Sequence, residues 1–314
     1  MHRSILSLIT ALCICNLSAC SAQTALPSSL FAARWNSGLN SEEPAYQVQA
    51  IDERTFVIRQ SIRSSFEAPF LYLLVGRERA LLIDTGDGGG GLRAEVDRLI
   101  QTSAHPDDAS LFPLVVMHSH GHTDHVGGDS EFVGRSNTTI VAHSQGEVAA
   151  FFGMRNWPNE NATFDLGGRV MDVLPAPGHQ AAHVVVFDRA TRLLFTGDTV
   201  YPGVLRFQCG NAAQYLATIE RLGAFASEND ARWLLGGHIE MREGAGQYYR
   251  APEHTRRDER RLELDPAVLN EIAAGVRRMG GNPRVEGYDN FVLFPHPANP
   301  QGLQPPDWCA AGGL

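Results

Sequence analysis

The sequence predicts an α/β fold in which two β-sheets pack face to face and helices cover both outer faces, an αββα sandwich in a single domain. Short apolar runs and longer helical stretches follow each other in the order strands, helix, strands, helix, and this order recurs once. No Pro- or Gly-rich linker divides the body of the chain. A length of 314 residues, with 43% hydrophobic and 19% charged residues, is also enough for one large α/β domain.

The first half of the body is predicted to be a meander of short strands followed by a helix. The pattern becomes strand-like from Tyr46, and strands are expected at 55–59, 70–75 and 80–83. The helix that follows has one apolar face, made of Leu92, Val96, Leu99 and Ile100. A buried strand at 114–117 then runs directly into a cluster of histidines.

The second half repeats this alternation. Strands are expected at 139–142, 169–174, 183–187, 193–195, 232–235 and 290–294, with a helix at 147–152. A longer helix is expected to be capped by Asn211, with its apolar face at Tyr215, Ile219, Leu222 and Ala226. The last helix is expected to have Asp265 as its N-cap, Pro266 in its first turn and Gly280 after its end. Its apolar stripe is Val268, Ile272, Val276 and Met279.

The N-terminus has the pattern of an export signal. Arg3 supplies a positive charge, and the apolar stretch from Ile5 to Leu17 is short for a membrane span. The residues Leu17-Ser18-Ala19-Cys20 resemble the bacterial lipobox, which implies that residues 1–19 are removed and that Cys20 carries lipid. By the same analogy Ser21, which is not an aspartate, favours the outer membrane, facing the periplasm. The alternative is a plain secretory signal cleaved near Ala22.

This interpretation divides the chain into four parts. Residues 1–19 are the signal peptide, 20–44 a tether rich in Ser, Ala, Pro and Asn, 45–245 the main domain, and 246–314 a C-terminal extension packed on it. After removal of the signal and lipidation of Cys20, two thiols remain, Cys209 and Cys309. An oxidising periplasm permits a disulfide between them, but the sequence leaves both the paired and the free state open.

Composition excludes several classes of function. The formal net charge is -9 and there is no long basic run, so nucleic acid is not an expected partner. The chain has no lysine, which excludes Schiff-base chemistry and a P-loop. Gly86, Gly88 and Gly91 fit a dinucleotide fingerprint, but the next strand ends at His118 instead of an acidic residue. We therefore expect a turn there.

The strongest chemical signal is a cluster of metal-ligand residues directly after the strand at 114–117. It fits H-x-H-x-D-H as His120, His122, Asp124 and His125. Imidazole nitrogens and carboxylates are the ligands that zinc takes. Further candidates stand at expected strand ends beside glycine, namely His179, Asp198 and His238. Together these residues predict a metal site.

In this order, the motifs resemble those of the metallo-β-lactamase-fold hydrolases, over roughly Tyr46 to Glu240. Asp84, in Leu81-Leu82-Ile83-Asp84-Thr85-Gly86, matches the first motif of that family and is expected to orient the histidine loop. The resemblance implies two zinc ions, with iron as the alternative metal. One ion is assigned to His120, His122 and His179, the other to Asp124, His125 and His238, and Asp198 bridges both.

The resemblance also implies a mechanism and a branch of the family. A hydroxide between the two metals is the expected nucleophile on a small ester, thioester or lactone, and Asp124 handles a proton. Aspartate at position 198 is typical of glyoxalase II-like thioesterases, lactonases and phosphodiesterases, whereas the β-lactamases of the fold carry Cys or Ser there. The alternatives are a mononuclear iron persulfide dioxygenase of the same fold, a phosphodiesterase or a β-lactam hydrolase.

Three further features have more than one interpretation. Tyr201 resembles the tyrosine that lactonases aim at the substrate oxygen, which makes it a candidate catalytic residue, or it is a packed core tyrosine. His183 either orients a ligand or caps a strand. The charged stretch Glu253–Arg261 is expected to be solvated, and the alternative is an arginine clamp for an anionic substrate.

Overall fold

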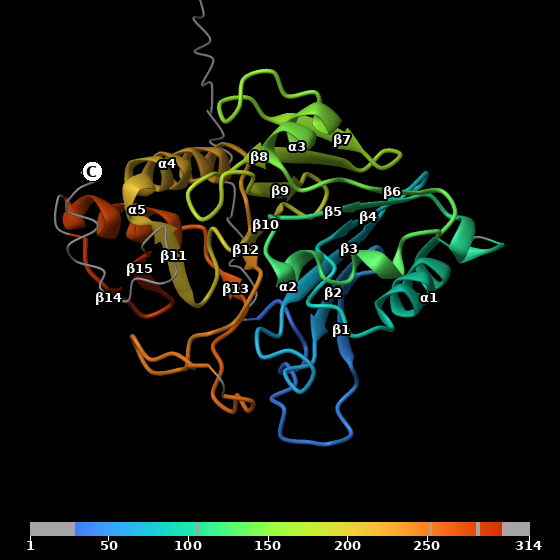
Figure 1. Cartoon of the computed structure of the whole chain (residues 1–314), viewed down its shortest axis with the longest axis horizontal. Coiled ribbons are helices and arrows are strands. Elements are labelled where there is room, and N and C mark those ends of the chain that lie inside the picture. Colours follow the sequence, from blue (N-terminus) through green and yellow to red (C-terminus); the bar gives the residue numbers. More distant parts are fainter. Residues whose placement is uncertain (1–28, 105–106, 252, 281–282, 297–314) are drawn as a thin grey trace, which may run out of the picture.

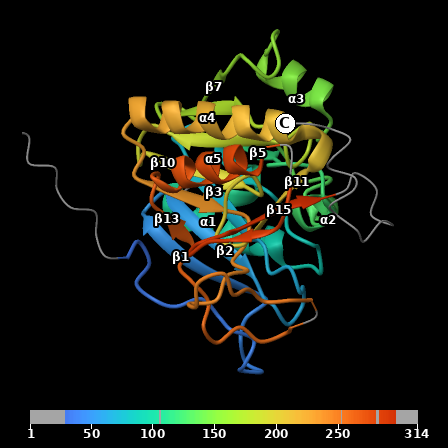
Figure 2. The same cartoon turned by 90° about the vertical axis from the view of Figure 1, so that its left-hand side faces the viewer.

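Two six-stranded β-sheets pack face to face, with helices on both outer faces (Figures 1 and 2). The structure, a computed structural model of the chain, describes residues 29–104, 107–251, 253–280 and 283–296. The first sheet has the order β1-β2-β3-β4-β5-β6 and the second the order β13-β12-β10-β9-β8-β7. The predicted αββα architecture is therefore confirmed.

The first sheet is antiparallel from β1 to β4 and parallel from β4 to β6. Its strands are β1 (Tyr46–Asp52), β2 (Thr55–Gln60), β3 (Phe70–Val75), β4 (Ala80–Ile83), β5 (Leu114–Met117) and β6 (Thr138–Ile140). Helix α1 (Leu92–Ala104) lies on its outer face. The residues that α1 buries are Leu92, Val96, Leu99 and Ile100, as predicted.

The second sheet carries the larger helices. Its strands are β7 (Ala162–Asp165), β8 (Val170–Pro175), β9 (Val184–Asp188), β10 (Leu193–Gly197), β12 (Trp233–Gly236) and β13 (Glu263–Leu264). Helices α4 (Ala212–Glu228) and α5 (Val268–Met279) share a buried cluster with its outer face. A small third sheet has the order β11-β15-β14 and consists of β11 (Val204–Gln208), β15 (Val292–His296) and β14 (Glu286–Gly287).

Short helical segments complete the described elements. They are α2 (Thr123–Val126), α3 (Gln145–Phe152) and the 3-10 turns η1 (Ala109–Leu111), η2 (Asp129–Glu131) and η3 (Cys209–Asn211). In the described residues, no helix is both long enough and apolar enough to cross a bilayer.

The central strands are buried on both faces, which explains their continuous apolar sequences. In β3, Phe70, Tyr72 and Leu74 pack between the sheets, while Leu71 and Leu73 pack under α1. This alternation follows from the two-residue period of a strand. It creates a layer of buried apolar side chains between the sheets, and the loops at one end of that layer hold the site.

Some predicted details were wrong. Helix α5 begins at Val268 with Ala267 as its cap, because Asp265 instead accepts a hydrogen bond from the Ala267 amide, 2.8 Å away, in a turn before the helix. Asn211 occupies the capping position of α4 without a side-chain cap bond. The strands β7, β11, β13 and β14 were not predicted. β13 and β14 have two residues each, and polar residues interrupt the apolar runs of β7 and β11.

The glycine loop after β4 is a turn, as predicted. Gly86, Gly88 and Gly91 all have positive φ, between 74° and 94°. Gln60 holds the loop by donating to the Gly88 carbonyl and accepting from the Asp87 amide.

The described parts of the expected tether and of the C-terminal extension contact the body. From Ser29 onward, the described part of residues 20–44 lies against the body, with Phe31 and Trp35 packed on the layer between the sheets. The expected boundary at residue 245 falls within a bridged segment, since Met241 pairs with Tyr248. Residues 1–28, with Cys20 and the signal, and Cys309 lie outside the described residues.

Candidate metal centre

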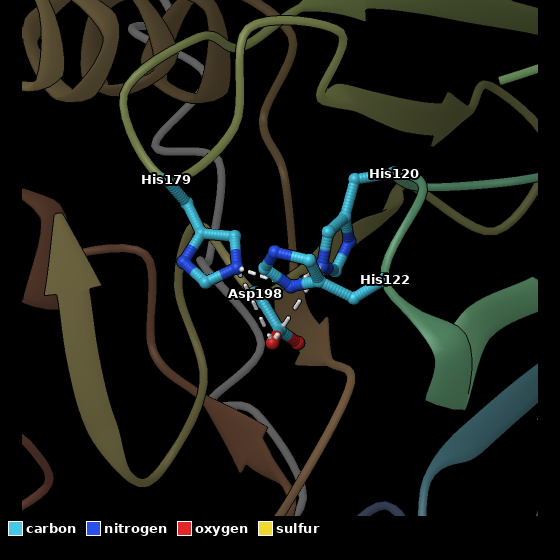
Figure 3. A group of neighbouring side chains, drawn as sticks. All are labelled: His120, His122, His179 and Asp198. Atoms are coloured by element: carbon cyan, nitrogen blue, oxygen red, sulfur yellow. Dashed lines mark hydrogen bonds and ion pairs between the residues drawn. The ribbon is translucent and has the colours of Figure 1, made fainter. Parts of the chain in front are cut away.

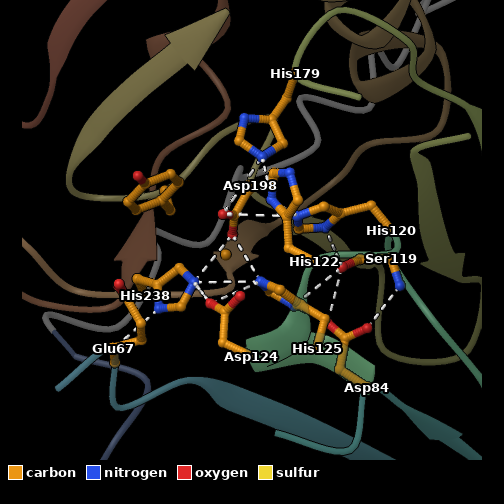
Figure 4. Close-up of polar contacts among 12 residues, drawn as sticks. Glu67, Asp84, Ser119, His120, His122, Asp124, His125, His179, Asp198 and His238 are labelled. Carbon is orange, nitrogen blue, oxygen red and sulfur yellow. Dashed lines mark hydrogen bonds and ion pairs between the residues drawn. The ribbon is translucent and has the colours of Figure 1, made fainter. Parts of the chain in front are cut away.

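The seven candidate ligands converge at one end of the two sheets (Figure 4). His120, His122, Asp124 and His125 lie on the loop and short helix α2 that follow β5 of the first sheet. The second sheet supplies the other three from loops that follow three of its strands. These are His179 after β8, Asp198 after β10 and His238 after β12. The two sheets thus contribute opposite sides of one site.

The first ligand group consists of His120, His122, His179 and Asp198, whose ligand atoms lie within 4.8 Å of one another (Figure 3). His122 Nδ1 is 2.8 Å from His120 Nε2 and 3.2 Å from His179 Nε2. Nitrogen atoms of three rings from two different sheets therefore face one common point.

The second ligand group consists of Asp124, His125 and His238, and the same 4.8 Å limit holds for it. Asp124 Oδ2 is 3.4 Å from His125 Nε2 and 3.2 Å from His238 Nε2, and the two Nε2 atoms are 3.3 Å apart. This group again joins the histidine loop of the first sheet to a loop of the second.

Asp198 lies between the groups and directs one oxygen to each (Figure 4). Its Oδ2 is 3.9 Å from His120 Nε2 and 3.7 Å from His179 Nε2. Its Oδ1 is 3.4 Å from His125 Nε2 and 3.2 Å from His238 Nε2. Oδ1 is buried and has no hydrogen-bond partner in the described part of the chain.

The outer ring nitrogens are held by acceptors. His179 Nδ1 is 2.8 Å from the Arg206 carbonyl, and His238 Nδ1 is 3.0 Å from the Glu67 carbonyl. Because a carbonyl oxygen only accepts, both Nδ1 atoms carry hydrogen, and in the neutral ring the lone pair of Nε2 points into the site. Histidine ligands of metal ions are held in this way in proteins.

Asp84 holds the histidine loop of the first sheet. Its Oδ1 accepts from the Ser119 amide at 2.6 Å, and its Oδ2 accepts from Ser119 Oγ and from His125 Nδ1, each at 2.8 Å. Ser119 Oγ is in turn 3.1 Å from His120 Nδ1. Asp84 has a left-handed backbone with a φ of 66°, a conformation that costs energy in most residues.

Burial keeps the imidazoles of the first group neutral. It lowers the pKa of His120 well below its usual 6.5, and the neighbouring His125 adds to this effect. Burial likewise lowers the pKa of His122, and it lowers that of His179 to about 4. At neutral pH these rings have lone pairs available for a metal.

The second group has the opposite charge state. Burial alone would lower the pKa of His125, but the carboxylates of Asp84 and Asp198 raise it well above 6.5. Similarly, Asp198 and Asp124 raise the pKa of His238 against the effect of burial. In return, these two histidines hold the pKa values of both carboxyls low. The protons on His125 and His238 therefore balance the negative charges of the nearby carboxylates.

These residues fit a pair of metal ions. The buried Asp198 Oδ1 has no counted hydrogen bond among the described residues, and its charge is balanced by the rings of His125 and His238, 3.4 and 3.2 Å away, a role that a bound cation can take over. The donor set of imidazole nitrogens and carboxylate oxygens is also the one that zinc and iron take in proteins.

Tyr201 lies beside the site with its hydroxyl already occupied. The side chain is buried, and the hydroxyl lies 2.6 Å from the Val204 carbonyl and 3.0 Å from Glu240 Oε2. Arg206 Nη1 donates to this hydroxyl and to Glu240. The geometry therefore favours the interpretation of Tyr201 as a packed core tyrosine, because its hydroxyl donates its proton to another group of the protein.

The sequence did not single out Glu67, Arg206 or Glu240, all of which border the site. Arg206 was hidden in an unpredicted strand, and Glu240 stands two residues after His238, where a carboxylate alone carries no signal. Burial raises the pKa of the Glu67 carboxyl.

The expectation that the stretch Glu253–Arg261 is solvated was wrong for two of its members. Arg256 is buried and donates to the carbonyls of Ile239 and Phe66. The buried Glu259 side chain pairs with both guanidinium nitrogens of Arg59, at 2.5 and 2.7 Å. The alternative of an arginine clamp for an anionic substrate does not describe Arg256 and Glu259 either, because their partners are other groups of the protein.

A cavity of about 420 Å³ opens onto the ligand groups. Its lining includes Phe66, Tyr248, Tyr249, Arg206 and Arg250, besides five of the seven candidate ligands. A larger cavity of about 670 Å³ lies between residues 29–37 and 256–265 but touches no candidate ligand. We therefore assign the site to the smaller cavity.

Comparison with known proteins identifies the family. Residues 66–238 match the family described as the metallo-beta-lactamase superfamily, a match of more than half the chain. The chain belongs to this superfamily. It is a hydrolase of that group, as the sequence predicted.

Two similar curated proteins are named as hydrolases. The acyl-coenzyme A thioesterase MBLAC2 of Gallus gallus is 27% identical over 233 residues, which cover 62% of this chain and 80% of that protein. The hydroxyacylglutathione hydrolase of Methylococcus capsulatus is 32% identical over 114 residues, 36% of this chain and 44% of that protein.

Solved structures support the fold. A metallo-beta-lactamase from Pontibacter korlensis matches with a TM-score of 0.50 and 20% identity, over 74% of this chain and 99% of that chain. At this identity the likeness concerns the fold alone.

Proposed function

We propose that this member of the superfamily is a dinuclear zinc hydrolase that cleaves thioesters, and more generally small esters or lactones. One observation carries the proposal: the Asp198 carboxylate directs one oxygen to each of two complete ligand groups. A residue in this position suits a bridge between two ions. Two zinc ions bound there would activate a water molecule and polarise the carbonyl of the substrate.

The side chains have distinct roles in this proposal. His120, His122 and His179 hold one ion, Asp124, His125 and His238 hold the other, and Asp198 holds both. Asp124 also borders the cavity, so it is the candidate to accept the proton of the attacking water. The names of the two relatives, a thioesterase and a hydroxyacylglutathione hydrolase, support a thioester substrate.

The cavity favours a substrate with an anionic group. Arg206 is anchored through Nη1 to Glu240, and Arg250 lies at the cavity over the ring of Tyr248, 5.6 Å from its centroid. The Arg206 guanidinium pairs with Glu240, whereas Arg250 is exposed at the cavity. We therefore expect Arg250→Gln to reduce kcat/KM for acyl-coenzyme A more than for an uncharged thioester, while Arg257→Gln, at an exposed arginine outside this cavity, changes neither.

The decisive experiment counts metals and tests substrates on the same purified protein. We expect two zinc ions per chain and hydrolysis of thioesters in preference to phosphodiesters and β-lactams. One iron ion per chain together with oxygen consumption would instead establish the persulfide dioxygenase alternative.

We further propose that the chain is exported and anchored to the outer membrane through lipid on Cys20. The support is the N-terminal pattern of a charged residue, an apolar stretch and small residues before a cysteine. Cys20→Ser is expected to release the protein from the membrane fraction, and a variant that still sediments with membranes contradicts the anchor.

A further inference from the structure

His183 lies behind the ligand groups and belongs to neither of them. It is fully buried, four residues after His179 and directly before β9. Its ring stacks on that of His120, with centroids 5.0 Å apart and planes 20° apart. Next to it, the Val184 amide donates to the Ser119 carbonyl at 2.8 Å, which ties this position to the histidine loop of the first sheet.

The hydrogen bonds of His183 determine where its proton lies. The Asp198 backbone amide is 3.1 Å from His183 Nε2, and because an amide only donates, Nε2 accepts. In a neutral ring, Nδ1 then carries the hydrogen and donates to Thr199 Oγ1, also 3.1 Å away. The ring therefore has one tautomer and contacts both ends of the Asp198–Thr199 dipeptide.

The Asp198 carboxylate is contacted by candidate ligands of both groups. Its Oδ1 lies 3.4 and 3.2 Å from Nε2 of His125 and His238, and its Oδ2 lies 3.7 and 3.9 Å from Nε2 of His179 and His120. Because these partners are themselves candidate metal ligands, the backbone that carries Asp198 is the support of the carboxylate that lies outside the ligand groups. Among the described residues, that backbone amide donates to His183.

The surrounding space leaves little freedom for this contact. Gly197, directly before Asp198, has a φ of 48°, and a Cβ placed there would lie 2.6 Å from Ser119 Cβ and 2.8 Å from His183 Nε2. The absence of a side chain at Gly197 lets the imidazole reach the following amide. The ring thus fills the narrow gap between the loops that carry His120 and Asp198.

We propose that His183 is a positioning residue that sets the direction of the Asp198 carboxylate: it accepts the Asp198 amide, donates to Thr199 and stacks on His120. In this way the two carboxylate oxygens of Asp198 point to different ligand groups, and the stacking keeps the His120 ring in its position beside them. This role rests on the proposed bridging function of Asp198. Residues that orient metal ligands typically contribute 10- to 100-fold to metal affinity.

Two variants separate the parts of this role. His183→Phe keeps a ring that stacks on His120 but removes the acceptor for the Asp198 amide. His183→Gln loses the ring but places an amide oxygen near the position of Nε2, where it accepts the same hydrogen bond. If the acceptor positions Asp198, the Gln variant rescues what the Phe variant loses.

The measurements are metal equivalents at equilibrium, metal affinity and the visible absorption spectrum of the cobalt-substituted protein. We expect His183→Phe to weaken binding of the second equivalent about 10- to 100-fold and to change the cobalt spectrum, with most of the loss restored in His183→Gln. Thr199→Val, which removes the partner of Nδ1, is expected to have a smaller effect in the same direction. Arg257→Gln, at an exposed arginine remote from this ring, is the control for substitution alone.

The outcomes distinguish the two proposals. A wild-type protein that binds one metal ion refutes the dinuclear function, whatever the variants do. A wild-type protein with two ions, together with a Phe variant of unchanged affinity and spectrum, refutes the role of His183. If the Phe variant does not fold, the comparison of His183→Gln with wild type decides: affinity within threefold supports the role of the acceptor, and a loss as large as 100-fold refutes it.

Discussion

The two ligand groups differ in how their imidazoles are charged before any metal binds. In the first group, the rings of His120, His122 and His179 are kept neutral by burial. In the second, carboxylates around His125 and His238 favour the protonated rings. A metal ion therefore enters the first group without displacing protons, whereas in the second it replaces protons that already balance the carboxylates.

The two ligand groups also differ in the residues that hold their histidines in place. Asp84 contacts His125 directly and reaches His120 only through Ser119. His179 is held by a neutral backbone carbonyl, that of Arg206. In the second group, His238 is likewise held by a backbone carbonyl, that of Glu67, so the charged support of this group is the Asp84 carboxylate behind His125.

The largest effect is expected from removing the residue that the groups share. Asp198→Ala should lower the metal content from two toward one ion per chain and abolish turnover, because both groups lose a ligand at once. Metal analysis and a thioester assay check this, with Asp87→Ala, at an exposed carboxylate near the site, as the control. Full activity of the Asp198 variant would contradict the bridging assignment.

A smaller and more selective effect is expected from Asp84→Asn. Asparagine tolerates the left-handed backbone at this position but removes the charge behind His125. We expect the second group to lose about 10- to 100-fold in metal affinity, and the first group less. Stepwise metal titration measures both, and Asp107→Asn serves as an exposed control. Equal losses in the two groups would show that Asp84 supports the whole loop alike.

Lowering the pH should weaken metal binding to the second group more than to the first. As the pH falls to 6, protons compete more strongly at His125 and His238, whose pKa values are raised, while His179, with a pKa of about 4, stays neutral. The second group should therefore release its ion at a higher pH than the first. Equilibrium dialysis at pH 8 and pH 6 tests this order, and simultaneous loss of both ions at one pH opposes it.

The smallest effect is expected from Tyr201→Phe. The hydroxyl is bonded to Val204 and Glu240, so its removal should cost about 1 kcal/mol of unfolding free energy and leave kcat within a few-fold of wild type. Denaturant unfolding and steady-state kinetics measure the two quantities. A hundredfold loss in kcat at unchanged KM would instead restore Tyr201 as a catalytic residue.

Much of the fold was predictable because its strands carry local signals. β3, β4 and β5 have the predicted bounds, since each is a continuous apolar run bounded by turn residues. Strand β11 was missed because its apolar run contains Arg206, which borders the cavity. Polar residues that line a site interrupt the same patterns that reveal a strand.

The sequence by itself determined the candidate ligands and the layered fold. Residues of metal-binding type follow the predicted strands, and the spacing of apolar residues within short segments predicts the strands and helices. Only the tertiary structure decided that His183 contacts the Asp198 amide, that Tyr201 is engaged by Glu240, and that Arg59 pairs with Glu259. The physical reason is that the partners in these contacts are 15, 39 and 200 residues apart. Such contacts arise when whole strands pack, and no local pattern encodes them.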